Sequence, residues 1–402
     1  MTTVIVRPGE SERLLAGHPW LYKGSVLRLT RPTADGELVQ VKDHRQRFLG
    51  MGFYNSQSKI SVRLLSNDRI TADAPFFRDR LHSALALRKK HMPDATSFRL
   101  VNAESDFLSG LIVDKYEDTA VVQISSLGMD QRKGMIVEAI HAAIKPQRIL
   151  ERSDAAARRF EGLDASSGVL KEAQPTDLET LTLSPILNGL KFEVGWSAGH
   201  KTGMYLDQQT NYQCASQWAK GAQVLDCFSF LGGFALHAAR AGAAHVHGID
   251  QSEDAVAAAS RNAKLNGLQD TCSFEAANVF DWLKAKTQTG PHEKVLPRFD
   301  LIILDPPSFT RNRDSVADAL RGYKEIHLRA LKLLKSKGIL LTFCCSHHVD
   351  RNMFEGVILS AAYDAQRVLR RVATFSQSLD HPVIPTIPET EYLKGFAFEI
   401  AR

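Results

Sequence analysis

Two short segments in the last quarter of the sequence carry residue types suited to chemistry on a planar, electron-poor ring. They read ILDPPSFTRN (303–312) and TFCCS (342–346). Proline lacks the N–H that a sheet ladder needs and restrains the residue before it, so the first apolar run must end as a strand at Asp305. The second run, GILLTFCCS, ends in the same way at a thiol. Because ligands bind outside the carboxyl ends of strands in open α/β sheets, we expect a carboxylate and a cysteine at one sheet edge.

The elements that must position these groups alternate from about residue 190 onward. Such alternation of strands with helices predicts a doubly wound, mostly parallel sheet. The predicted strands are QVLDCFS, HVHGID, CSFEAAN, FDLIILD, GILLTFCC and GFAFEIA, and helices such as FALHAARAG and IHLRALKLLKSK fill the gaps.

Two other regions precede this sheet. Residues 1–75 show short β-like runs such as ELVQVKD, FLGMGFY and ISVRLL, which predict a small β barrel or sandwich. Residues 76–190 mix helices and strands and include a hairpin that turns at Tyr116–Thr119. The polar segment GLDASSGVLKEAQPTDLE is predicted to be a loop or linker. We therefore expect an α/β protein with domains at 1–75, 76–190 and 191–402.

Three earlier strand ends predict a nucleoside site. Gly232 and Gly233 open a helix, where backbone can approach a ligand closely, but their spacing is not the GxGxxG of a dinucleotide site. Asp250 ends the next strand, about 20 residues on, and suits ribose hydroxyls. Its alternative role is to cap the helix that begins SEDAV. Asn278 ends the third strand, at a position that can reach an adenine edge.

Composition limits the function classes. The net charge of +5 and the pI of about 8.9 are compatible with nucleic acid. Five scattered cysteines do not form a disulfide framework, so we expect a reduced, cytoplasmic chain. Without CxxC or a spaced Cys/His set we expect no metal. No signal peptide is expected, and no apolar run approaches the ~20 residues of a membrane span, so we expect no membrane association.

Beyond single motifs, the sequence resembles one family from end to end. Its C-terminal half is similar to Rossmann-like S-adenosylmethionine-dependent methyltransferases, specifically the PUA-domain ribosomal RNA cytosine-5 methyltransferases. The resemblance rests on GHKTGMYLDQQ (199–209), DCFSFLGGF, LDPPSF, RGYKE, GILLTFCCS and DHPVIPTIPETEYLKGF. GHPWLYKGSV resembles the family's PUA-like RNA-binding domain, and LVNAESDFLSGLIVDKY its central α/β domain.

This resemblance implies methylation of cytosine C5 in 23S ribosomal RNA, with S-adenosyl-L-methionine as cofactor. Carbon 5 becomes a nucleophile only after a thiolate adds to C6, which requires a cysteine, a group that favours charge at N3, and a base. The family's nucleophile is the cysteine directly before serine, here Cys345, which leaves Cys344 as a bystander. Asp305 is expected to contact the N3/N4 edge; its alternative role is to cap the loop after its strand.

The resemblance also implies a set of cofactor contacts. Tyr205 would stack on adenine, or else serve as a core residue of a turn, and Gln208 would donate a hydrogen bond nearby. The full expected cofactor set is Tyr205, Gln208, Ser229, Gly232, Asp250, Asn278 and Asp305.

Five positions depart from the family pattern. Relatives usually have Arg at position 209 and often at 212, Thr at 231, Lys at 308 and Gly at 347, where this chain has Gln209, Tyr212, Leu231, Ser308 and His347. The lost positive charges change the expected grip on phosphate more than the reaction.

Two other functions stay open from sequence. One is methylation of an exocyclic base amine without a covalent step, with Phe309 stacking on the base. The other is RNA binding by a degenerate transferase. Because the target base must leave its stack, we expect protein-free or partly assembled rRNA as the partner. Whether the chain forms a homodimer stays open.

Overall fold

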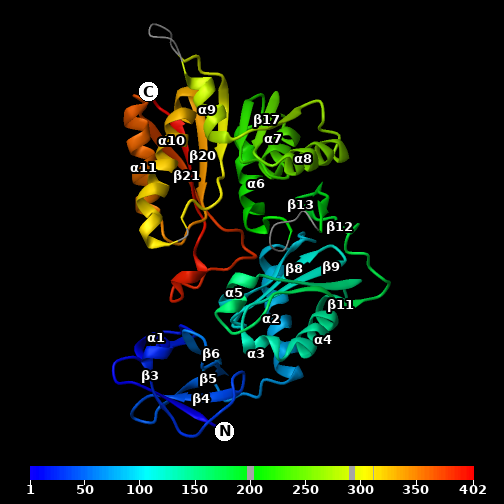
Figure 1. Ribbon diagram of the computed structural model, residues 1–402. Helices are drawn as coiled ribbons and strands as arrows, with labels where there is room; N and C mark the ends of the chain where they lie inside the picture. Colours follow the sequence, from blue (N-terminus) through cyan, green and yellow to red (C-terminus); the bar gives the residue numbers. More distant parts are fainter. Residues whose placement is uncertain (197–202, 289–294, 311) are drawn as a thin grey trace. The chain divides into compact units, whose positions relative to one another are not determined.

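The computed structural model describes residues 1–196, 203–288, 295–310 and 312–402 (Figure 1). The chain divides into two compact units. The first contains residues 1–186, 195–206 and 379–390, and the second contains residues 187–194, 207–378 and 391–402. Segment 379–390 therefore packs with the first unit although the second unit flanks it in the sequence. Residues 199–202, which begin the segment GHKTGMYLDQQ, lie outside the described residues.

The first unit begins with a six-stranded sheet in the order β2-β6-β5-β4-β1-β3. Its core consists of branched aliphatic side chains that alternate along the strands, among them Val4, Val39, Val41 and Val62. The elements are β1 (Thr3–Val6), α1 (Glu12–Leu15), β2 (Trp20–Tyr22), β3 (Val26–Leu29), β4 (Leu38–Lys42), β5 (Phe48–Tyr54) and β6 (Ile60–Ser66).

A five-stranded sheet in the order β11-β10-β9-β8-β7 follows in the same unit. Asp73 starts its long helix by accepting a hydrogen bond from the Phe76 N–H, and the helix buries Phe77 and Leu81. The elements are α2 (Ala74–His91), β7 (Phe98–Asn102), β8 (Leu111–Tyr116), β9 (Thr119–Ile124), α3 (Leu127–Asp130), α4 (Lys133–Ile144), β10 (Arg148–Ser153), α5 (Ala155–Arg159) and β11 (Ser166–Glu172).

Two predictions for this region have different outcomes. The hairpin is confirmed, since β8 and β9 pair antiparallel with Tyr116 opposite Thr119. The linker prediction for GLDASSGVLKEAQPTDLE is wrong over Ser166–Glu172, which forms edge strand β11 against β10. Its polar sequence hid this strand, because backbone hydrogen bonds rather than an apolar face hold it in place. Two short ladders follow: β12 (Thr182–Leu183) with β15 (Val194–Gly195), and β13 (Ile186–Leu187) with β14 (Leu190–Lys191).

The second unit is built on a seven-stranded sheet in the order β18-β17-β16-β19-β20-β22-β21. The first five strands of this order run parallel, while β22 and β21 are antiparallel to their neighbours. Its strands are β16 (Gln223–Cys227), β17 (His245–Asp250), β18 (Cys272–Ala276), β19 (Phe299–Leu304), β20 (Leu334–Cys344), β21 (Leu369–Ser376) and β22 (Lys394–Ile400). This arrangement confirms the predicted Rossmann-like α/β class; β21 was not predicted.

Helices cover this sheet and fix its strand ends. Helix α10 buries Ala319, Tyr323, Ile326 and Ala330, at the spacing of one helical face. From this face, the ring of His327 bridges the Tyr323 carbonyl and the Thr342 hydroxyl on β20. The helices are α6 (Gln209–Ala215), α7 (Gly233–Arg240), α8 (Glu253–Leu265), α9 (Val279–Thr287), α10 (Val316–Leu333) and α11 (Arg351–Asp364).

Candidate active site

The two segments with chemically suited residues end neighbouring strands. Strands β19 and β20 pair parallel, with Leu304 opposite Thr342, so Asp305 and Cys345 follow adjacent carboxyl ends. Cys345 is half-buried, whereas Cys344 is fully buried within the hydrophobic core under α10 and α11. The alternation of a strand therefore directs the two adjacent thiols to different environments.

The carboxyl of Asp305 is held in an environment that favours its protonated form. Burial, reinforced by the nearby negative charge of Asp207, raises its pKa from 3.8 to about 7, although a hydrogen bond from Gln208 opposes the shift. Gln208 Nε2 donates to Asp305 Oδ1 at 3.0 Å. A carboxyl with this pKa is both a proton donor and an acceptor near neutral pH.

The side chain of Gln208 is held in place by a further hydrogen bond. Asn211 Nδ2 donates to Gln208 Oε1 at 2.6 Å and to the Ser376 carbonyl on β21 at 2.9 Å. The predicted cofactor residue Gln208 therefore lies beside the predicted catalytic residue Asp305, where it fixes the carboxyl's orientation.

The glycine turn after β16 brings backbone into close contact with neighbouring elements. Gly232 has φ +85°, in the left-handed region that favours glycine. A Cβ at Gly233 would lie 2.5 Å from the Tyr212 ring. In the same turn, the buried hydroxyl of Ser229 has no hydrogen-bond partner among the described residues. The turn therefore carries an unsatisfied polar atom, the Ser229 hydroxyl, beside the carboxyl edge of the sheet.

Asp250 and Asn278 hold the loops beside this turn. The Asp250 carboxylate accepts from the N–H groups of Phe230 at 2.9 Å and Ser252 at 3.0 Å. The helix cap is Ser252, which accepts from Ala255, so the alternative role of Asp250 as that cap is wrong. Asn278 is exposed and caps α9 through its Oδ1. Each side chain lies at a strand end as predicted, with backbone contacts that fix its orientation.

Tyr205 is 42% exposed and belongs to the first unit, whereas the other predicted site residues belong to the second. Its contact with the cofactor stays a prediction.

Two carboxylates near the site were not among the predicted site residues. Asp226 on β16 is buried, and burial together with the negative charges of Asp305 and Asp250 raises its pKa well above its usual value. Its Oδ2 accepts from the Ala235 N–H, while its Oδ1 has no partner among the described residues. Asp207 accepts a 2.6 Å hydrogen bond from the Tyr392 hydroxyl, and its other oxygen is likewise buried without a described partner. An acidic residue inside the apolar run VLDCF was the available signal for Asp226.

These carboxylates suit a cationic ligand. In the part of the chain that the structure describes, Asp207, Asp226, Asp250 and Asp305 have no Lys, Arg or His ion-pair partner. Buried negative charges normally require a compensating cation. S-adenosylmethionine carries a sulfonium and an ammonium group, so these carboxylates fit this cofactor.

The five departures from the family pattern have local structural roles. Leu231 and Gln209 are buried, and the Gln209 carbonyl accepts from Asn188. Tyr212 packs edge-on against Phe234 at 4.6 Å. The hydroxyl of Ser308 donates to the Thr310 carbonyl, and the exposed ring of His347 lies 5.6 Å from that of Tyr392.

The aromatic ring in the DPPSF segment is already packed. Phe309 lies 4.6 Å from the Tyr323 ring, 5.6 Å from Phe280 and 6.5 Å from Phe228, measured between centroids. These contacts place its ring against the core rather than in a free stacking platform.

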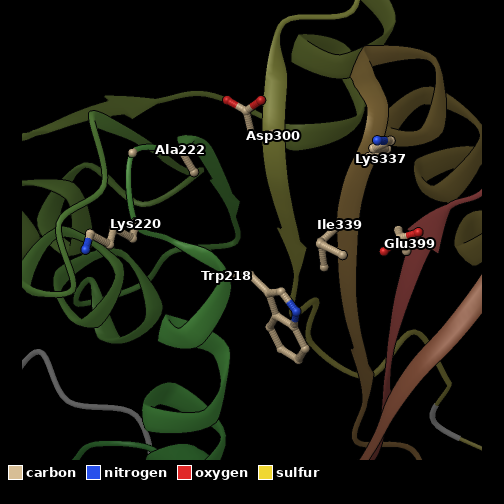
Figure 2. Close-up of a pocket in the computed structure, with 8 residues that line it drawn as sticks. Trp218, Lys220, Ala222, Asp300, Lys337, Ile339 and Glu399 are labelled. Atoms are coloured by element: carbon tan, nitrogen blue, oxygen red, sulfur yellow. The ribbon is translucent and has the colours of Figure 1, made fainter.

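A cavity of about 410 Å³ lies at the opposite, amino-terminal edge of the same sheet (Figure 2). Its carboxylates are neutralised: Asp300 pairs with Lys335 at 2.9 Å, and Glu399 pairs with Arg370 at 2.8 Å. The lining residues are Trp218, Lys220, Gly221, Ala222, Asp300, Lys337, Ile339 and Glu399.

Within the described ranges, no cluster of three or more His, Cys, Asp or Glu residues has a geometry for holding a metal ion. None of the described helices combines the length and apolar character needed to span a membrane.

Comparisons with known proteins identify the family of this chain. A PUA-like domain family matches residues 4–67, and an S-adenosylmethionine-dependent methyltransferase family matches residues 166–374. The chain is 36% identical to "Ribosomal RNA large subunit methyltransferase I" of Photobacterium profundum over 98% of each chain. It is 38% identical to the protein of the same name from Alteromonas mediterranea, over 99% of this chain and 98% of the relative.

Solved structures agree on the fold over the full lengths of both chains. A methyltransferase complexed with SAH has a TM-score of 0.82 at 22% identity. An S-adenosylmethionine-dependent methyltransferase from Streptococcus mutans has a TM-score of 0.80 at 20% identity.

Proposed function

Because this chain belongs to the S-adenosylmethionine-dependent methyltransferase family that includes ribosomal RNA large subunit methyltransferase I, we propose that it methylates carbon 5 of a cytosine in 23S ribosomal RNA. The observation that carries this proposal is that Cys345 and Asp305 follow the adjacent carboxyl ends of β20 and β19. A half-buried thiol on the strand end next to that of a carboxyl with a pKa of about 7 suits covalent attack on a pyrimidine.

The chain's own residues act in sequence. The Cys345 thiolate forms a bond to C6 of the cytosine, and the displaced electron pair moves toward N3. Protonated Asp305 donates to that edge and stabilises the negative charge that develops there. Carbon 5 is then nucleophilic, and the bound cofactor supplies the methyl group. Removal of the C5 proton by a base lets the C6–sulfur bond break, which frees the product and restores the thiolate.

The cofactor would be held at the carboxyl edge of the sheet. Asp226 and Asp207 would face its positive charges, and Ser229 with the backbone at Gly232 would line the turn. Asp250 would accept from ribose hydroxyls with the lone pairs that its two backbone contacts leave, and Asn278 would meet the adenine edge. Tyr205 is proposed to stack on adenine from the segment that precedes Gln208.

RNA capture would be shared among three domains, at residues 1–75, 76–190 and 191–402. The PUA-like segment would supply phosphate contacts and shape reading. The target cytosine must leave its stack to reach Cys345, so naked or partly assembled rRNA in the cytoplasm is the proposed substrate. Equal methylation of intact large subunits and naked rRNA would contradict this choice.

One alternative reaction, methylation of an exocyclic base amine, is less well supported. It requires Phe309 to stack on the base, but that ring already packs against Tyr323 and Phe280. It also gives no role to Cys345.

The experiment that tests the proposal is a tritiated methyl-transfer assay on protein-free 23S rRNA, with nucleoside analysis of the product. Wild type is compared with Cys345→Ala and with the matched control Cys344→Ala. We expect 5-methylcytosine from wild type and from Cys344→Ala, and none from Cys345→Ala. An N-methylated base, or product from Cys345→Ala, would establish the alternative reaction instead.

A further inference from the structure

A buried lysine lies beside the strand end that carries Cys345. Lys394 is the first residue of β22, and it pairs with Cys344 across the ladder between β20 and β22. Its side chain is only 7% exposed. The Nζ atom donates to the Ser346 carbonyl and to the Val349 carbonyl, each at 2.5 Å. Both carbonyls belong to the turn that follows Cys345 directly.

The positive charge of Lys394 has no ion-paired carboxylate counter-charge among the described residues. Among the described residues Lys394 forms no ion pair with a carboxylate, although moving an ammonium out of water is costly without a counter-charge. Two backbone carbonyls satisfy two of its three N–H donors but bring no negative charge. The site therefore lacks one anion, and a thiolate on the adjacent strand end would supply it.

The other titratable groups around Lys394 and Cys345 do not supply the missing negative charge. Burial lowers the pKa of Lys394, and the thiols of Cys344 and Cys345 act in the opposite direction. Arg351 and Glu391 also act on Lys394, with opposite signs, and they pair with each other at 3.3 Å. Tyr323 is buried beside both thiols, and burial raises its pKa, so it stays neutral.

We propose that Lys394 is a positioning residue that holds Cys345 in the thiolate form and fixes the turn that carries it. This inference rests on the proposed function, in which Cys345 is the nucleophile. The thiol proton leaves to solvent, Lys394 keeps its own protons, and the sulfur lone pair is then available for the bond to C6. When that bond breaks at the end of the cycle, the returning thiolate meets the same ammonium group.

The test measures the thiol directly, without RNA or cofactor. The rate of Cys345 alkylation by iodoacetamide is followed against pH, and tandem mass spectrometry separates Cys345 from Cys344. A nearby opposite charge shifts a pKa by about one unit or more, so Lys394→Met should move the Cys345 profile up by about one pH unit. Lys394→Arg, which keeps the charge, should restore most of the wild-type profile.

Two further variants separate charge from structure. Lys394→Gln keeps an N–H donor for the carbonyls but has no charge, so it should behave like Lys394→Met. If Lys394→Gln retains the wild-type profile, the lysine acts only through its hydrogen bonds and the proposal is overturned. Lys335→Met removes an ion-paired lysine from the other end of β20 and should leave the profile unchanged. Methyl transfer by Cys345→Ala would defeat the proposed function without altering the alkylation result, so the two failures are distinguishable.

Discussion

The acidic side chains at the two edges of the seven-stranded sheet differ in whether they have ion-pair partners. At the amino-terminal edge, beside the cavity of Figure 2, Asp300 and Glu399 are paired with Lys335 and Arg370. At the carboxyl edge, four aspartates lie close enough to perturb one another, and none has an ion-pair partner among the described residues. The two carboxylates beside the cavity are therefore ion-paired, whereas none of the four aspartates at the carboxyl edge has a described ion-pair partner.

We propose the carboxyl edge as the functional one because of this difference rather than because of cavity size. At the half-exposed Asp300, partial burial is outweighed by hydrogen bonds from the Gln223 N–H and from Lys335, which lower the pKa, so its charge is paired within the fold. Leaving Asp226 and Asp305 with raised pKa values stabilises the fold less but favours a cationic ligand and a proton-donating carboxyl.

The largest effect is expected from removing the proton donor at the functional edge. Asp305→Ala should lower kcat for RNA methylation by about 10²–10³-fold, because the charge that develops at N3 loses its partner. Asp300→Ala, which removes a carboxylate from the other edge, should leave kcat unchanged. Single-turnover methyl-transfer rates check both variants, and equal losses would remove the distinction between the edges.

The same carboxyl predicts a pH dependence. Asp305 must be protonated to donate, and its pKa is about 7, so kcat/KM should fall as pH rises above about 7. Asp305→Asn cannot ionise and should lose the basic limb. Retention of that limb in Asp305→Asn would assign it to another group.

A smaller effect is expected for cofactor affinity. Asp226→Asn keeps an oxygen for the Ala235 N–H but removes the negative charge, so it should weaken S-adenosylmethionine binding by about tenfold, or about 1.4 kcal/mol. S-adenosylhomocysteine has no sulfonium charge and should lose less affinity. Isothermal titration with both ligands checks this difference; equal losses would mean that Asp226 acts through structure alone.

Replacing Asp305 should raise the stability of the fold above neutral pH although it lowers activity. The folded-state pKa is raised, so the native carboxyl keeps its proton up to about pH 7 while the unfolded one loses it near 3.8. Stability therefore falls as pH rises between these values. Asp305→Asn avoids this cost and should be more stable than wild type by on the order of 1–2 kcal/mol above pH 7, with no gain below pH 4. Urea unfolding at pH 8 and at pH 4 measures the difference.

The smallest effect is expected at the satisfied edge. Trp218→Ala and Lys220→Ala change the lining of the cavity but no group near the aspartates, so S-adenosylmethionine affinity should match wild type. Isothermal titration of each variant with S-adenosylmethionine measures this affinity. A tenfold loss in either would make the amino-terminal edge part of the cofactor site and break the comparison.

The sequence predicted where the strands end better than it predicted which residues surround those ends. Prolines and apolar runs located Asp305 and Cys345, because strand termination is a local property. Asp226 and Lys394 were not predicted, because the role of a polar residue in a strand depends on the neighbours that the fold places around it. Strand β11 was missed because ladder hydrogen bonds, not an apolar pattern, hold it against β10.

The central claim is that Cys345 forms a bond to the target cytosine, and trapping that bond tests it most directly. A 23S rRNA transcript made with 5-fluorocytidine in place of cytidine retains a fluorine at C5 that cannot leave as a proton does. With cofactor present, wild type and Cys344→Ala should form a covalent protein–RNA complex that survives denaturing electrophoresis, and Cys345→Ala should form none. A complex formed by Cys345→Ala, or none with wild type that still methylates the normal transcript, would contradict the account.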